Sequence, residues 1–505
     1  MSVRGNTELR QLALSVLQPG FVGTTPPDWL LRAVQDGLGS VVLFSRNILS
    51  IEQVARLTER LRAENPDLIV AIDEESGDVT RIESATGSSR PGNFALGYVD
   101  DPELTSSVAA DLGRQLRAAG VSLNYGPSVD VNSNPDNPII GVRSFGVDPK
   151  VVCRHAGAWV RGLQSSGVAA CAKHFPGHGD VAVDSHHGLP VYDTTREELE
   201  AQALPPFRAA LDAGARAVMS AHLLVPACDP AVPATLSSRI LGDLLRGELG
   251  FDGLIITDAI EMGAVADRYG VTGAAVAAVT AGADAICVGG ENADEGIATG
   301  IVDALAQAVL AGDLPVERLT DAARRVREFA AWSSRLAPAA SDGSVPDGSV
   351  GLSAARRAIR VRGATHGVLP VSASPHVVEL SPATNLAIGK ETPWGVAASL
   401  LQHIPSATSV RLGQENLDPP AATADLCGLD GARGRPLVVV VRDAARHRWM
   451  THALEEITGA RPDAIVVEMG LPGQRWGATT LDTHGASTAS GAAVAELLAG
   501  APARP

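Results

Sequence analysis

The chain is poor in lysine and cysteine, and each shortage excludes a class of protein. Only three lysines occur among its 505 residues, and the formal net charge is −16. No basic stripe is available to neutralise a phosphate backbone, so we expect no nucleic-acid partner. The five cysteines are odd in number and show no CxxC spacing, which indicates a reducing compartment.

Long apolar runs are also missing. No run of about 18 apolar residues occurs, and residues 1–30 lack a basic start followed by an apolar stretch. We therefore expect a cytoplasmic protein without a membrane partner. The content of 45% hydrophobic and 19% charged residues is ordinary for a folded protein, and the length exceeds that of one usual domain, so two domains are expected.

Short apolar runs alternate with helical patterns between residue 8 and about residue 332. The runs are uninterrupted, which is typical of parallel strands buried on both faces. We expect strands within 40–47, 68–73, 121–127, 168–175, 215–224, 253–260 and 283–290. Amphipathic helices are expected at 101–119, 151–165, 195–213 and 296–312. This order predicts an α/β fold with a (β/α)8 TIM-type barrel over residues 1–335, although one strand remains unassigned.

A second domain is expected after a linker. Residues 336–350 are rich in Pro, Gly, Ser and Ala and have no periodicity. Beyond them, apolar runs at 376–382, 437–443 and 464–470 and helical patterns at 446–458 and 487–499 follow. Residues 351–505 are therefore predicted to form a smaller α/β layered sandwich domain.

Polar and titratable residues fall where the predicted barrel strands end. They are Asp73, Asn124, Lys173 with His174, Ser220 with His222, and Thr257 with Asp258. The carboxyl ends of the strands carry the active site in TIM barrels. This placement predicts an enzyme.

The stretch KHFPGHGDVAVDSHHGLP, residues 173–190, combines four histidines with two aspartates and a lysine. Lys173 and His174 end a strand, and the prolines and glycines that follow predict a loop. Within that loop Asp184 and His186 stand two residues apart. A carboxylate in a turn can fix one imidazole nitrogen and raise the basicity of the other, which predicts an acid/base dyad.

Other interpretations of this loop are weaker. Zinc sites of the HExxH type need a helix that the prolines and glycines disfavour, so we expect no metal and no cofactor. The glycines lack the GxxxxGK[ST] arrangement of a phosphate cradle. A solvated loop with incidental histidines does not explain why Lys173 and His174 cap a buried strand.

A second candidate stands in IITDAIEM, residues 255–262. Asp258 ends an apolar strand at the barrel mouth, where it can be a nucleophile, a general base or the N-cap of the next helix. Glu261 fits a capping box and is expected to be structural.

These stretches together resemble glycoside hydrolase family 3, in the two-domain form of its bacterial β-N-acetylglucosaminidase (β-N-acetylhexosaminidase) branch. The resemblance covers the barrel in order, through segments 71–81, 141–146, 173–190, 218–237 and 250–262. The Lys-His-x-Pro-Gly-His-Gly to Asp-Ser-His segment is the most specific of them. The tail at 483–500 is similar to the end of the family's two-domain members.

The resemblance implies a role for each matching residue. Asp258 stands where the family has its nucleophile, and His186 with Asp184 stands where this branch has its acid/base dyad. The terminal sugar is expected to be bound by Asp73, Arg143, Lys173 and His174. For His178 and Asp130 we favour structural roles.

The activity implied is that of a retaining exo-β-N-acetylglucosaminidase, which removes terminal non-reducing N-acetylglucosamine through a covalent glycosyl-enzyme intermediate. Its partner is a small glycoside or oligosaccharide, such as a muropeptide from peptidoglycan turnover or a chitin fragment. One alternative is a phosphorylase that uses inorganic phosphate as the acceptor. Another is a non-catalytic sugar-binding protein on the same scaffold.

The chain departs from the family in one place. Where the family usually has Glu-Gly-Gly-Arg-Val, this sequence has Glu75-Ser76-Gly77-Asp78-Val79. Ser76 replaces a glycine, and Asp78 reverses the charge of an arginine, so a family contact to the aglycone is in doubt. The second domain is expected to have a packing role, since the dyad at 184 and 186 is complete without it.

Overall fold

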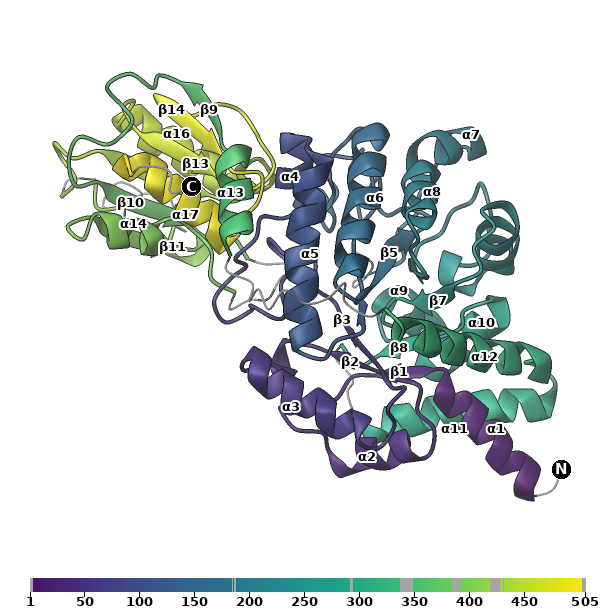
Figure 1. Ribbon diagram of the computed structural model, residues 1–505. Helices are drawn as coiled ribbons and strands as arrows, with labels where there is room; N and C mark the ends of the chain where they lie inside the picture. The colour runs from purple at the N-terminus through teal and green to yellow at the C-terminus, as the bar shows by residue number, and fades with distance from the viewer. Residues whose placement is uncertain are drawn as a thin grey trace. The chain divides into compact units, whose positions relative to one another are not determined.

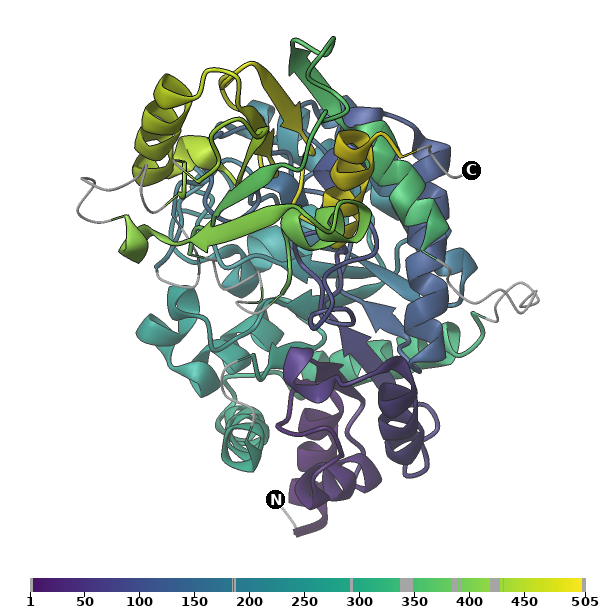
Figure 2. The same ribbon diagram turned by 90° about the vertical axis from the view of Figure 1, so that its left-hand side faces the viewer.

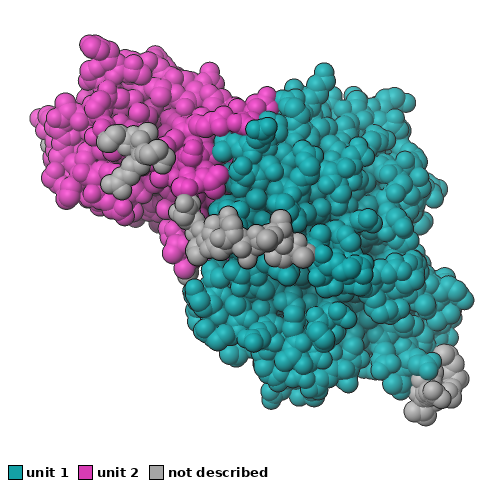
Figure 3. All heavy atoms as spheres, in the orientation of Figure 1, with its two compact units in different colours: residues 1–75, 102–140, 144–346 teal, residues 76–101, 141–143, 347–505 magenta. Residues whose placement is uncertain are grey.

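The computed structural model describes residues 3–183, 185, 188–290, 294–336, 348–383, 389, 392–417, 427–429 and 431–501. The chain forms two compact units (Figure 3). The first comprises residues 1–75, 102–140 and 144–346, and the second comprises residues 76–101, 141–143 and 347–505. Two short N-terminal segments thus belong with the C-terminal part of the chain. The predicted boundaries at residues 335 and 351 stay predictions.

The first unit is built on eight strands among the described residues. They are β1 Leu17–Pro19, β2 Ser40–Leu43, β3 Ile69–Ile72, β4 Leu123–Asn124, β5 Ala169–Phe175, β6 Ala217–Ser220, β7 Leu254–Thr257 and β8 Ile286–Val288. Strands β2 to β7 form a parallel sheet in chain order, and β1 pairs in parallel with β8.

Two contacts join these groups into a closed ring. A parallel bridge links Ile256 with Ala285, and the Ser40 hydroxyl donates a hydrogen bond to the carbonyl of Leu17 at 3.3 Å. The (β/α)8 prediction is confirmed, and each predicted barrel run contains a strand. The unassigned strand is β1.

Helices cover the outside of the barrel (Figures 1 and 2). The longer ones are α1 Val3–Ser15, α2 Asp28–Gln35, α3 Ile51–Arg62, α5 Pro102–Ala118, α6 Pro149–Ser165, α8 Leu204–Asp212, η5 Arg239–Glu248, α10 Val271–Ala281, α11 Glu295–Ala311 and α12 Val316–Ser333. Side chains of Ser50, Asp148 and Asp294 cap α3, α6 and α11 by accepting a backbone N–H of the first turn. None of the helices in the described ranges is long and apolar enough to cross a bilayer.

The barrel interior is one apolar cluster. Ile69, Leu123, Cys171 and Ile256 are buried there, and α12 contributes Phe329 to the same cluster. The uninterrupted apolar runs of the sequence reflect this burial, because both faces of every strand are covered.

The second unit is a layered sandwich, as predicted. Its strands are β9 Arg360–Gly363, β10 His376–Leu380, β11 Thr408–Leu412, β12 Leu437–Val441, β13 Ile465–Glu468 and β14 Thr479–Asp482. Their order is β11-β10-β12-β13-β14-β9, with only β9 antiparallel among these described strands. Its helices are α4 Asn93–Val99, α13 Ser349–Ala358, α14 Ala397–His403, α16 Arg448–Ala460 and α17 Thr488–Ala499. Separate apolar clusters form on Val438 and on Val439, whose side chains point to opposite faces of β12.

Asp78, which departs from the family pattern, lies in this second unit. Its carboxylate accepts the Ala486 N–H at 2.8 Å and pairs with the Arg442 guanidinium at 2.6 Å. Burial raises the pKa of Asp78, and the charge of Arg442 opposes that rise. The charge reversal therefore has a partner within the same unit. Ser76 takes the left-handed conformation, with φ of 65°, at a position where the family has glycine.

Candidate active site

The carboxyl ends of β3, β5 and β7 bring three predicted site residues to one end of the barrel. Asp73 follows β3 directly, Lys173 lies near the end of β5, and Asp258 follows β7. Parallel strands place all these ends on the same face. The pairing of β5 with β6 is irregular between Ala172 and Phe175, and such irregularities re-aim side chains next to active sites.

Lys173 is a buried cation held between two carboxylates. Its Nζ pairs with Oδ1 of Asp73 and lies 2.6 Å from Oε1 of Glu75. The side chains of Lys173 and Glu75 are each 2% exposed, whereas that of Asp73 is 23% exposed. A buried ammonium needs such compensation, because an unpaired buried charge is costly. Asp73 is the accessible member of this cluster.

Asn124, at the end of β4, holds the backbone between these two acids. Its amide accepts the N–H of Glu74 at 2.9 Å and donates to the carbonyl of Glu74 at 2.7 Å. Because the side chain of Asn124 holds both the backbone N–H and the backbone carbonyl of Glu74, the direction of the backbone from Asp73 to Glu75 is fixed. Sequence reasoning did not assign Glu75 a role. Its spacing of two from Asp73 was the available signal, since alternate residues of an extended chain share a face.

His174 is oriented by Asp130. Its Nδ1 lies 2.7 Å from Oδ2 of Asp130, which also accepts the Ser128 hydroxyl at 3.0 Å. The other oxygen of Asp130 accepts the backbone N–H groups of His174 at 3.3 Å and His178 at 2.7 Å. A carboxylate only accepts, so Nδ1 of His174 is the donor.

These contacts shift the pKa values of Asp130 and His178. Burial acts to raise the pKa of Asp130, but the charge and hydrogen bonds of His174 outweigh it and hold the pKa below its ordinary range. For His178, burial followed by the charge of His174 lowers the pKa to about 4. His178 is therefore neutral near pH 7. The structural role expected of Asp130 is to hold the imidazole ring of His174 in one orientation.

Asp258 is partly exposed and its backbone is tightly held. Its N–H donates to the carbonyl of Ser220 at 3.1 Å, and its Oδ1 accepts the N–H of Ala259 at 2.8 Å. The alternative of Asp258 as an N-cap is wrong, because the following helix, α9, begins at Gly263 after an N-cap at Met262. The capping box expected of Glu261 is wrong for the same reason. Its Oε1 instead accepts the N–H of Gly289 at 2.8 Å, beyond β8.

The predicted dyad, Asp184 and His186, lies outside the described residues. Ser185, between them, is described and buried. Its carbonyl accepts the N–H of Ala264 at 3.2 Å, and its hydroxyl lies 3.3 Å from Nε2 of His178.

Arg143 belongs to the second unit. It ends the short helix η2 Gly141–Arg143, is buried, and its carbonyl accepts the Asn93 side chain at 2.7 Å. Its predicted sugar-binding role stays a prediction. Across the described ranges, no group of three or more His, Cys, Asp or Glu side chains is arranged to hold a metal ion.

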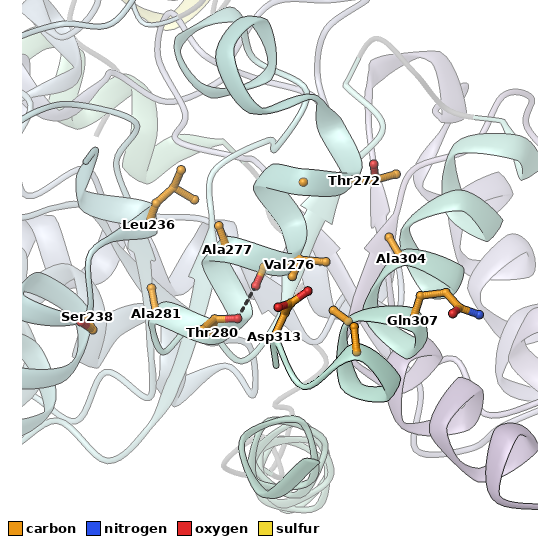
Figure 4. Close-up of a pocket in the computed structure, with 13 residues that line it drawn as sticks. Leu236, Ser238, Thr272, Val276, Ala277, Thr280, Ala281, Ala304, Gln307 and Asp313 are labelled. Atoms are coloured by element: carbon orange, nitrogen blue, oxygen red, sulfur yellow. Dashed lines mark hydrogen bonds between the residues drawn. The ribbon is translucent and has the colours of Figure 1, made fainter. Parts of the chain in front are cut away.

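A separate cavity of about 730 Å³ lies among the outer helices of the first unit (Figure 4). Its wall consists mostly of small side chains from α10 and α11, including Ala277, Ala281, Ala304 and Ala308. No predicted site residue lines this cavity. We therefore keep the candidate site at the carboxyl ends of the strands.

Comparison with known proteins identifies this architecture. Residues 28–329 match the glycosyl hydrolase family 3 N terminal domain. A solved structure described as a glycoside hydrolase family 3 beta-N-acetylglucosaminidase from Paenibacillus sp. str. FPU-7 is 32% identical, with a TM-score of 0.85 over 97% of this chain and 96% of that one.

Two curated relatives match part of the chain. Beta-hexosaminidase A of Pseudoalteromonas piscicida is 36% identical over 52% of this chain and 47% of its own length, so the match spans about half of that relative. Beta-hexosaminidase of Alkalilimnicola ehrlichii is 39% identical over 49% of this chain and 73% of its own length. The family-model match, which covers more than half of the chain, places it among the glycosyl hydrolases. The chain belongs to glycosyl hydrolase family 3.

Proposed function

We propose that this chain is a retaining exo-β-N-acetylglucosaminidase that removes terminal, non-reducing β-linked N-acetylglucosamine. The names of the relatives at 36% and 39% identity and of the Paenibacillus structure support the sugar. The observation that carries the chemistry is the placement of Asp258, which is partly exposed directly after β7 at the barrel end that also holds Asp73 and Lys173.

Asp258 is the proposed nucleophile. In the first step its carboxylate bonds to the anomeric carbon while the glycosidic C–O bond breaks, and His186 gives its proton to the leaving oxygen. In the second step water attacks the same carbon, its proton passes to His186, and the Asp258 carboxylate is released. Two inversions give net retention of the β configuration. Asp184 is proposed to hold the His186 ring.

Asp73, Lys173, His174 and Arg143 are the proposed ligands of the terminal sugar. The exposed edge of Asp73 can accept sugar hydroxyls, and Lys173 beside it contributes N–H donors. His174 is presented by its bond to Asp130. Asp73, Lys173 and His174 are held by ion pairs and hydrogen bonds in the absence of substrate. Substrate binding therefore costs little entropy for ordering these side chains.

The test is hydrolysis of 4-nitrophenyl N-acetyl-β-D-glucosaminide by the wild type and by Asp258→Asn. We expect wild-type turnover and a loss in Asp258→Asn of at least about 10⁴-fold, since the covalent path needs a carboxylate. Equal, measurable rates in the two proteins would place the nucleophile elsewhere, and no turnover in either would indicate a sugar-binding protein without catalysis.

Phosphorolysis remains the alternative acceptor reaction. The proposed acid/base is an imidazole, which is neutral after it gives up its proton and so does not repel an anionic acceptor. The discriminating measurement is sugar release with phosphate and with sulfate at equal ionic strength. For a hydrolase we expect equal rates and no sugar phosphate.

A further inference from the structure

His222 contacts the backbone immediately beyond the proposed nucleophile. It lies two residues after β6 and is 1% exposed. Its Nε2 is 3.0 Å from the carbonyl oxygen of Ala259, the residue that follows Asp258. A carbonyl only accepts hydrogen bonds, so Nε2 carries a hydrogen and is the donor.

The other side of the ring is held by Thr235. Nδ1 of His222 is 2.9 Å from the Thr235 hydroxyl, which also lies 2.8 Å from the carbonyl of Ala221 and 3.0 Å from the hydroxyl of Ser220. If the Thr235 hydrogen points to Nδ1, the ring is neutral. If it points to Ala221, Nδ1 donates to Thr235 and the ring is charged. Both arrangements keep the Nε2–H on Ala259.

The peptide group between Ala259 and Ile260 is therefore fixed at both ends. Its carbonyl accepts from His222, and its N–H donates to the carbonyl of Cys287 at 2.9 Å. The preceding N–H, that of Ala259, is the one that binds Oδ1 of Asp258. The direction of the Asp258 carboxylate thus depends on the backbone that His222 holds.

We propose that His222 is a positioning residue for Asp258, which acts by donating from Nε2 to the Ala259 carbonyl. The inference rests on the proposed role of Asp258 as nucleophile. His222 takes no part in proton transfer. It keeps the carboxylate on the line of attack at the anomeric carbon, where a shift of about 1 Å costs on the order of 100-fold in rate.

Two substitutions separate this bond from mere burial. In His222→Gln the side-chain amide reaches the position of Nε2 and can donate to Ala259. In His222→Asn the amide reaches only the position of Nδ1 and keeps the contact with Thr235. His155 offers a matched control, because it is fully buried and its Nδ1 is 2.8 Å from the hydroxyl of Thr105, between α5 and α6.

The measurements are kcat and KM with 4-nitrophenyl N-acetyl-β-D-glucosaminide, and the thermal unfolding midpoint. We expect His222→Asn to lower kcat by about 100-fold with KM changed by less than about threefold, and His222→Gln to recover at least about tenfold of that loss. His155→Gln and His155→Asn should leave kcat unchanged. Both His222 variants should unfold within a few degrees of the His155 variants.

Equal kcat values in His222→Gln and His222→Asn would overturn the proposal, as would wild-type kcat in a folded His222→Asn. If His222→Asn does not fold, Thr235→Val carries the test. It frees the ring, and we expect a fall in kcat of about tenfold at constant KM, whereas an unchanged kcat contradicts the inference. Failure of the proposed function itself looks different, since the wild type would then release no nitrophenol at all.

Discussion

The buried side chain of His178 is expected to make the unfolding free energy depend on pH. Burial and the charge of His174 lower its pKa to about 4, whereas an unfolded histidine titrates near about 6.5. Between these values the unfolded chain binds more protons than the folded one. The contribution of neutral His178 to the unfolding free energy is therefore fully present above pH 6.5 and is lost as the pH falls towards 4.

We predict that His178→Asn makes the stability of the first unit less sensitive to acid. From pH 7.5 to pH 5.0, the wild type should lose about 2 kcal/mol of unfolding free energy that the variant does not lose. Urea denaturation at the two pH values measures the difference. His366→Asn, the same substitution at an exposed position outside the first unit, is the control.

The proposed acid, His186, predicts a dependence on the leaving group. His186→Ala should slow a glycoside with an alkyl leaving group by at least about 100-fold, but a dinitrophenyl glycoside far less, because a good leaving group departs without a proton. Hydrolysis rates across a series of aryl and alkyl N-acetylglucosaminides test this. A uniform loss across the series would place the acid elsewhere.

The seam between β1 and β8 depends on a close approach of two glycines. Gly20 donates its N–H to the carbonyl of Val288 at 2.7 Å, and a Cβ on Gly289 would lie 2.5 Å from the nitrogen of Gly20. Gly289 also has a φ of 112°, which L side chains rarely adopt. Arg46 covers this seam by donating to the carbonyl of Gly290 at 2.6 Å.

Gly289→Ala should therefore destabilise the barrel by about 2–4 kcal/mol, through backbone strain together with overlap. Gly312→Ala separates the two causes. Gly312 also has a positive φ, but a Cβ there would meet no atom within 4 Å, so it should cost only about 1 kcal/mol. Thermal and urea unfolding of both variants measure the difference, and equal losses would contradict the overlap argument.

The strands that the sequence predicted share one property, which is burial on both faces. Uninterrupted apolar runs revealed β2 to β8, β10, β12 and β13. Strand β1 was missed because its three residues, LQP, contain a glutamine and a proline. Strands β9, β11 and β14 were also missed. RVRG and TSVRL are polar and largely exposed, and TTLD is buried but contains only one apolar residue.

Part of the candidate site could likewise be predicted from the sequence, and part could not. The placement of Asp73, Lys173, His174 and Asp258 at one end of the barrel could be predicted, because each lies at or near the end of an apolar strand. The bond from His222 to Ala259 could not, because it joins β6 to the residue after Asp258 through tertiary packing. The grouping of residues 76–101 with the C-terminal part was also unpredictable, since the ion pair between Asp78 and Arg442 spans most of the chain.

Substitutions of Asp78 and Arg442 test how much this ion pair contributes to the stability of the second unit. Both side chains are buried, so removing one partner leaves an uncompensated charge. Asp78→Asn or Arg442→Met alone should cost about 3–5 kcal/mol, and the double variant should cost clearly less than the sum. Asp101 and Arg357, an exposed pair at 2.8 Å in the same unit, form the control cycle and should couple by about 1 kcal/mol or less. Additive losses at residues 78 and 442 would contradict the account.

The most direct measurement is covalent trapping of the enzyme with a fluorinated N-acetylglucosaminide that forms the glycosyl-enzyme intermediate and resists its hydrolysis. Peptide mass spectrometry of the inactivated protein locates the sugar. We expect one sugar per chain, attached to the Asp258 carboxylate, and no labelling of Asp258→Asn. A sugar found on any other side chain, or turnover without any covalent species, would contradict this expectation.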